Sequence, residues 1–175
     1  MKKSVFLPVI AIGVAALVLW GASLSLNSLA AANAQAEHLK MMQTILPDST
    51  EFVPEPYTGD DANIRTVHKG ETGFVLETVT AGYAGEITML IGVSKEGRVT
   101  GLVVRDMNET YTLGANALHD LEFLAQFLNT KGGITEVDAI SGATVTSKAI
   151  ARCVNSAVAY VTGADAQSAA TSWGG

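Results

Sequence analysis

The sequence contains a single cysteine, Cys153, among its 175 residues. One thiol excludes an internal disulfide, and it also excludes an iron–sulfur cluster held by local thiolates, which takes several cysteines. No Cys-x-x-Cys-His motif for covalent haem is present, and the three histidines, at positions 38, 68 and 119, lack metal-ligand spacing. If the protein carries out redox chemistry, an organic cofactor therefore has to supply it.

Basic residues are also scarce, with 11 Lys and Arg against 17 Asp and Glu, a net charge of −6 and a pI near 4.9. This balance argues against nucleic-acid binding, because phosphate backbones require a basic surface. Apolar residues, in contrast, make up 48% of the chain, and the mean hydropathy is +0.29. Such values are high for a soluble domain and direct attention to a membrane segment.

Charged residues are absent from positions 4–36, and within this stretch Val5–Leu26 is almost wholly apolar. About 20 apolar residues span a bilayer as a helix, so the sequence predicts one N-terminal transmembrane helix. Lys2 and Lys3 should stay cytoplasmic, which places the rest of the chain outside. The alternative is a signal peptide cleaved at one of the small-residue sites at 30–36, although the apolar run is long for one. Both interpretations export the remainder.

Beyond this segment, the pattern predicts an antiparallel β-meander. Apolar runs at Phe74–Thr80, Ile87–Val93 and Val99–Val104 are separated by turn signals. Gly97, between the last two runs, can adopt the positive φ that a hairpin loop needs.

Helical patterns flank the meander. Leucines 118, 121, 124 and 128 form a stripe that predicts a helix ending at Gly132-Gly133, and residues 134–140 read as a short strand. A longer amphipathic helix containing Cys153 should end at Gly163, with Cys153 as a small core residue. The fold class is therefore α+β, an antiparallel sheet with packed helices preceded by a transmembrane helix. The predicted divisions are an anchor at 1–32, a linker helix and loop at 33–60, a domain at 61–165 and a tail at 166–175.

The start of the last helix is rich in hydroxyl groups and poor in bulk. The residues concerned are Ser141, Gly142, Ala143, Thr144, Thr146, Ser147 and Lys148. Helix N-terminal ends attract phosphate, because their N–H groups are unpaired and carry partial positive charge. Ser and Thr are also ordinary helix caps, so these residues alone leave a phosphate site and a plain cap both open.

The stretch Asp138–Thr144, Asp-Ala-Ile-Ser-Gly-Ala-Thr, resembles the flavinylation motif of the covalent FMN-binding domain family. This domain occurs in the G subunit of Rnf complexes and in the C subunit of the sodium-pumping NADH:quinone reductase. The resemblance implies that FMN is attached through a phosphoester to the side-chain oxygen of Thr144, and that a dedicated flavin transferase installs it. The further FMN-binding residues implied around Thr144 are Ser141, Gly142, Ala143, Val145 and Thr146.

The resemblance extends to two other places in the chain. Gly82-Tyr83-Ala84-Gly85 corresponds to a turn before the family's β-hairpin, which makes Tyr83 a candidate contact. A flavin-holding Glu-Thr-Pro-Gly-Leu-Gly loop corresponds to residues 109–114, where Glu109, Thr110, Leu113 and Gly114 match. Tyr111 and Thr112 depart from that pattern, so the geometry of the loop is open.

The short length and single anchor look more like the G subunit of Rnf complexes, which move electrons between ferredoxin and NAD⁺ and couple this to ion transport. The resemblance implies an electron-transfer protein, incomplete as an enzyme alone, with covalent FMN and the other membrane subunits of the complex as partners. It should be a single-pass protein of the cell membrane, with its flavin domain on the outer, periplasmic face. The alternatives are the C subunit of the quinone reductase, a free-standing extracellular flavoprotein, or an anchored binding module without flavin.

Overall fold

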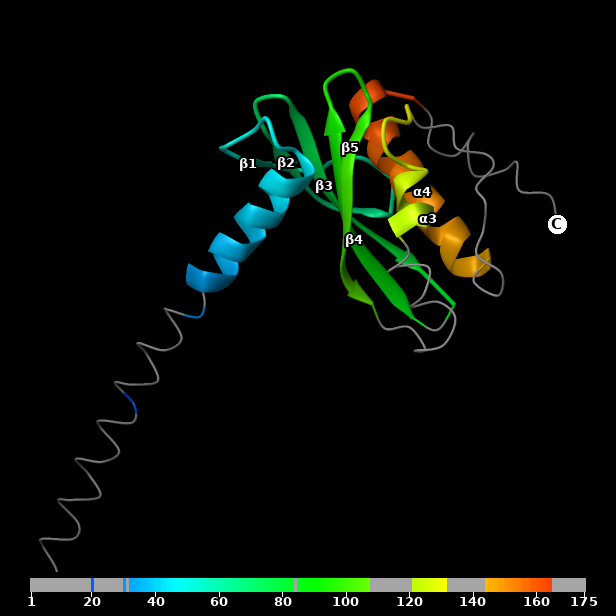
Figure 1. The fold of residues 1–175 in the computed structure, drawn as a ribbon, viewed down its shortest axis with the longest axis horizontal. Coiled ribbons are helices and arrows are strands. Elements are labelled where there is room, and N and C mark those ends of the chain that lie inside the picture. The colour runs from blue at the N-terminus through cyan, green and yellow to red at the C-terminus, as the bar shows by residue number, and fades with distance from the viewer. Residues whose placement is uncertain are drawn as a thin grey trace, which may run out of the picture. The chain divides into compact units, whose positions relative to one another are not determined.

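The computed structural model describes Trp20, Ala30 and residues 32–83, 85–107, 121–131 and 144–164 (Figure 1). The chain divides into two compact units, Met1–Lys40 and Met41–Gly175. In the first unit, residues 32–40 are helical, and the helix continues to residue 45 in the second. The predicted anchor at Val5–Leu26 lies outside the described residues except for Trp20. Among the helices that are described, none is long and apolar enough to cross a membrane.

A five-stranded sheet forms the centre of the second unit. Its strands are β1 (Val53–Glu55), β2 (Ile64–Lys69), β3 (Gly73–Ala81), β4 (Glu86–Ser94) and β5 (Val99–Met107). They lie in chain order, and every neighbouring pair is antiparallel. The predicted meander is therefore confirmed as β3 to β5, and β1 and β2 extend it. The α+β class is confirmed as well.

One face of the sheet is covered by α3 (Leu121–Ala125) and α4 (Thr144–Thr162), drawn in yellow and orange in Figure 1. The apolar stripe of α4 lies in the core as the sequence predicts, and Cys153 is fully buried there. From the sheet, this core takes alternate residues of β4, as expected when one strand face packs against a helix. They are Ile87, Met89, Ile91 and Val93.

The predicted leucine stripe at 118–128 is wrong for Leu121 and Leu128, whereas Leu124 is partly buried and packs against the core. Leu121 is 82% exposed and Leu128 is 41% exposed, whereas Phe123 and Phe127 are 2% and 0% exposed. Their rings meet edge to face, with centroids 5.4 Å apart. The reason is that α3 has only five residues. Non-helical turns follow it at 126–129, and the last of these residues, Asn129, has a left-handed conformation (φ 61°). A long helical period does not apply to so short an element.

The opposite face of the sheet carries a second, smaller core. Met42, Ile45 and Leu46, at the end of the incoming helix, pack on Val75 of β3 and Leu90 of β4. These apolar residues are 5% exposed or less. Residues 41–46 are thus part of the compact second unit, whereas the finer divisions predicted at 32, 60 and 165 stay a prediction.

Candidate functional site

Thr144 is the first residue of α4, and its neighbour Val145 is 48% exposed. Both residues are open to solvent, whereas Thr146 and Ser147 are buried, at 0% and 1% exposure. The helix is 19 residues long and has no acidic residue in its first turn. Its unpaired N–H groups and partial positive charge are therefore not neutralised by a carboxylate of that turn, which favours an anion at this end.

Thr146 has a buried hydroxyl oxygen that makes no hydrogen bond with any described residue. The sequence left open that Thr146 caps the helix, but the structure places it as the third residue of α4 and gives it no capping bond. Buried polar groups are nearly always paired, because an unpaired one loses its hydration without compensation. A phosphate or hydroxyl group bound at this helix end would supply the partner, so the orphan hydroxyl fits FMN.

Cys153 lies two turns further along α4 and takes no part in such a site. Burial raises the pKa of its thiol to about 11, and the nearby Thr78 hydroxyl, which makes no well-aligned hydrogen bond, offsets only part of this rise. A thiol with so high a pKa is protonated and unreactive at neutral pH. The structure thus confirms that Cys153 is a core residue.

Tyr83 is 73% exposed in the turn between β3 and β4, which the Gly82 N–H closes by donating to the Gly85 carbonyl at 2.7 Å. The remaining predicted site residues lie outside the described residues, as does the predicted strand at 134–140. They are Glu109, Thr110, Leu113, Gly114, Ser141, Gly142 and Ala143. Of the predicted set, the structure therefore brings Thr144, Val145 and Thr146 together on one helical turn.

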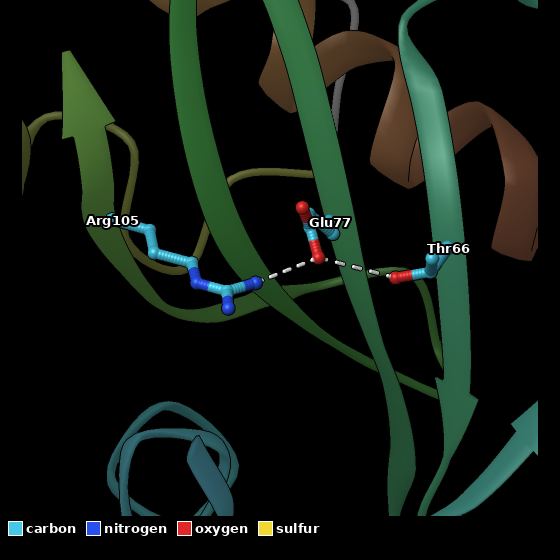
Figure 2. A network of polar contacts seen from close by, with 3 residues as sticks. All are labelled: Thr66, Glu77 and Arg105. Atoms are coloured by element: carbon cyan, nitrogen blue, oxygen red, sulfur yellow. Dashed lines mark hydrogen bonds and ion pairs between the residues drawn. The ribbon is translucent and has the colours of Figure 1, made fainter. Parts of the chain in front are cut away.

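Sequence reasoning missed a polar network on the sheet face opposite α4. Figure 2 shows Glu77 of β3 between Thr66 of β2 and Arg105 of β5. The Glu77 Oε2 atom accepts from Arg105 Nη1 at 3.0 Å and from Thr66 Oγ1 at 3.5 Å, and the Glu77 side chain is only 12% exposed. The available signal was a lone carboxylate within the apolar run of β3. A buried charge at such a position needs a charged partner, which here comes from β5, on the other side of β4.

Comparison with known proteins places this geometry within a recognised domain. The FMN-binding domain family matches residues 82–159, which include β4, β5, α3 and most of α4. The site at the start of α4 therefore lies inside the matched region.

Three curated relatives share similarity with the chain. The G subunit of the ion-translocating oxidoreductase complex of Methanosarcina acetivorans is 38% identical over 148 residues, 73% of this chain and 77% of the relative. The G subunit of the Na⁺-translocating ferredoxin:NAD⁺ oxidoreductase complex of Acetobacterium woodii is 37% identical over 98 residues, 49% of this chain and 47% of the relative. Its counterpart in the proton-translocating complex of Clostridium ljungdahlii is 35% identical over 99 residues, 51% of this chain and 53% of the relative.

Proposed function

The chain belongs to the G-subunit family of ion-translocating oxidoreductase complexes, and we propose that it transfers electrons within such a complex through FMN bound at the start of α4. The observation that carries the proposal is the exposed Thr144 at the unneutralised end of a 19-residue helix, beside a buried hydroxyl without a partner among the described residues. When bound, FMN supplies reversible electron acceptance, which the single buried cysteine cannot provide.

Thr144 is the proposed attachment residue, joined to FMN by a phosphoester. Its exposed side chain is accessible to the flavin transferase that the proposal requires for maturation. The first N–H groups of α4 would bind the phosphate, and the Thr146 hydroxyl would donate to it or to the group next to it. Val145, half exposed on the same turn, would contribute apolar contact.

Further cofactor contacts are proposed from the resemblance of the flanking sequence. Ser141, Gly142 and Ala143 directly precede the helix, and a Gly-Ala pair leaves room for close approach of a ligand to the backbone. Tyr83 and the loop at 109–114 (Glu109, Thr110, Leu113 and Gly114) would hold the ring system. The support for Tyr83 from the structure is that its side chain is exposed in the turn before β4 and is therefore accessible to a ligand.

The proposed setting is the cell membrane, with the other subunits of the complex as partners. An N-terminal anchor at Val5–Leu26 would leave the flavin domain on the outer face. The names of the relatives specify sodium for one complex and protons for another, so family membership does not select the coupling ion.

Intact-mass analysis of the chain from its native host tests the proposal. The expected mass exceeds that of the polypeptide by one FMN less one water, and peptide analysis should place the addition on Thr144. Thr144→Ala should abolish it while costing at most about 0.5 kcal/mol of stability, because the side chain is exposed. An unmodified mass, or a flavin on Thr146, would contradict the assignment.

A further inference from the structure

We infer that residues 41–50 form a rigid joint within the second unit, which fixes this stretch of the predicted linker to the sheet, so that these residues do not act as a hinge. Its consequence for electron transfer rests on the proposed function, since the position of a tethered flavin then depends on this attachment. Three sets of contacts within the second unit support the inference.

The first set is a direct contact between the backbone of the helix end and the sheet. Gly92 of β4 and Gly101 of β5 are cross-strand partners. A Cβ atom on Gly92 would lie 2.5 Å from the Ile45 carbonyl oxygen, and one on Gly101 would lie 2.8 Å from the Ile45 Cα. No side-chain layer separates the two backbones here, so the helix end lies directly against the backbone of β4 and β5.

The second set of contacts consists of hydrogen bonds at the end of the helix. The last carbonyl groups of a helix lack partners within the helix. The Thr100 hydroxyl of β5 donates to the Ile45 carbonyl at 2.6 Å, and the Gln43 Nε2 atom donates to the Thr50 carbonyl at 3.2 Å. The helix therefore ends in bonds to the sheet and to its own following loop.

The third set holds the loop after the helix on the turn between β2 and β3. The Ser49 hydroxyl lies 2.9 Å from the Thr72 hydroxyl and accepts from the Thr72 N–H at 3.1 Å. The Glu71 carboxylate accepts from the Thr50 N–H and the Thr50 hydroxyl, both at 3.0 Å, and from the Glu51 N–H at 3.4 Å. Ser49 is only 1% exposed.

The helix end is thus attached to β4 and β5, and the loop that follows is attached to the β2–β3 turn. Two attachments at different places on one sheet remove the rotational freedom that a flexible linker would have. The predicted linker therefore contains no hinge between Met41 and Thr50.

Hydrogen exchange of the full-length chain, with and without flavin, tests the rigid joint. The hydrogen-bonded amides of residues 42–46, 49 and 50 should be protected to the same degree as those of β4, in both preparations. Exchange of these amides within seconds would overturn the inference. Because the measurement does not need flavin, failure of the proposed function leaves its outcome unaffected.

Glu71→Ala should accelerate exchange of the Thr50 and Glu51 amides about tenfold or more, since their hydrogen bonds to a charged group are lost. Glu51→Ala, which removes a neighbouring exposed carboxylate, is the matched control and should leave exchange unchanged. If Glu71→Ala does not fold, Thr100→Val removes the bond to Ile45 in its place, and unchanged exchange in a folded variant would count against the joint.

The functional arm uses the assembled complex. A variant shown by exchange to have a loosened joint should keep its flavin content and flavin potential but transfer electrons severalfold more slowly. An unchanged rate in that variant would overturn the role of the joint in positioning the flavin.

Discussion

The Thr146 hydroxyl would favour ligand binding, because a ligand can supply the hydrogen bond that this group lacks. Its oxygen is buried without a hydrogen bond to any described residue, two positions after the exposed Thr144. An unpaired buried polar group costs roughly 1–3 kcal/mol. The protein without flavin carries this cost, and a bound phosphate would remove it.

Thr146→Val should therefore stabilise the flavin-free protein, by about 1 kcal/mol, because it replaces the unpaired hydroxyl with a methyl group of similar size. The same change should stabilise the flavin-loaded protein less or destabilise it. Denaturant unfolding of both forms measures the two effects, and equal changes in both would show that the hydroxyl does not contact the cofactor.

The ion pair between Glu77 and Arg105 should contribute measurably to stability. Arg105→Ala removes the partner of a carboxylate that is 12% exposed, and the expected loss is about 1–2 kcal/mol, discounted because Arg105 itself is 43% exposed. The control is Arg65→Ala, which breaks the 3.9 Å pair with Glu86, whose side chains are 49% and 74% exposed. Chemical denaturation should show a loss near zero for the control, and equal losses would contradict the argument.

At the scale of elements, the hairpin between β4 and β5 depends on Gly97. This residue has a φ of 76°, as the sequence predicted, and its N–H donates to the Ser94 carbonyl at 2.9 Å. A Cβ atom at Gly97 would also collide with the Cγ2 atom of Thr162, at the end of α4. The loop is therefore packed against the helix as well as tightly turned.

Gly97→Ala should cost more than Gly163→Ala. Both glycines have positive φ, at 76° and 70°, but a Cβ atom at Gly163 would meet nothing within 4 Å. The shared backbone penalty is about 1 kcal/mol, and overpacking adds typically 1–3 kcal/mol at Gly97 alone. Thermal unfolding of the two variants measures the difference, and similar losses would mean that Thr162 moves aside freely.

The hydrogen bonds that hold residues 50 and 51 on the β2–β3 turn should weaken in acid. The pKa of Glu71 is held below its ordinary value of 4.5, first by its own backbone N–H and then by the hydroxyl and N–H of Thr50. Its contribution to stability is therefore complete above that value and is lost as the pH falls through the lower pKa of the folded state. The melting temperature of Glu71→Gln should lie below that of the wild type near pH 7, and the gap should close on acidification. A gap that persists at low pH would contradict this.

At the scale of the whole molecule, both faces of the sheet pack against helical segments. One carries α3, α4 and the proposed flavin site, and the other carries the end of the incoming helix at residues 41–46. The FMN-binding domain family matches residues 82–159 of this unit. A compact flavin domain attached through a rigid joint is suited to holding a redox cofactor at a defined place.

The N-terminal segment should remain in the mature protein, because Val5–Leu26 is long enough to span a bilayer and longer than a usual signal core. N-terminal sequencing of the native protein should begin ahead of Val5. A start at or beyond Ala31 would identify a cleaved signal peptide in its place.

The sequence alone determined the features that depend on local pattern. The antiparallel run of β3 to β5, the left-handed Gly97 and the apolar stripe of α4 were all predictable, because each follows from apolar runs, turn residues or spacing within a short stretch of sequence. The family was predictable from the resemblance of residues 138–144 to its flavinylation motif, whereas the small residues and hydroxyls alone left a plain helix cap open. The roles of the individual flavin contacts stay predictions.

Tertiary structure decided which of several similar side chains are buried and paired. Phe123 and Phe127, rather than Leu121 and Leu128, are buried in the core because α3 is too short to keep one helical face toward the sheet. The buried hydroxyl of Thr146 and the contact of Gly92 and Gly101 with Ile45 involve surfaces supplied by distant parts of the chain. Local periodicity holds no information about such surfaces, because burial and steric fit are properties of two elements in contact and not of either one alone.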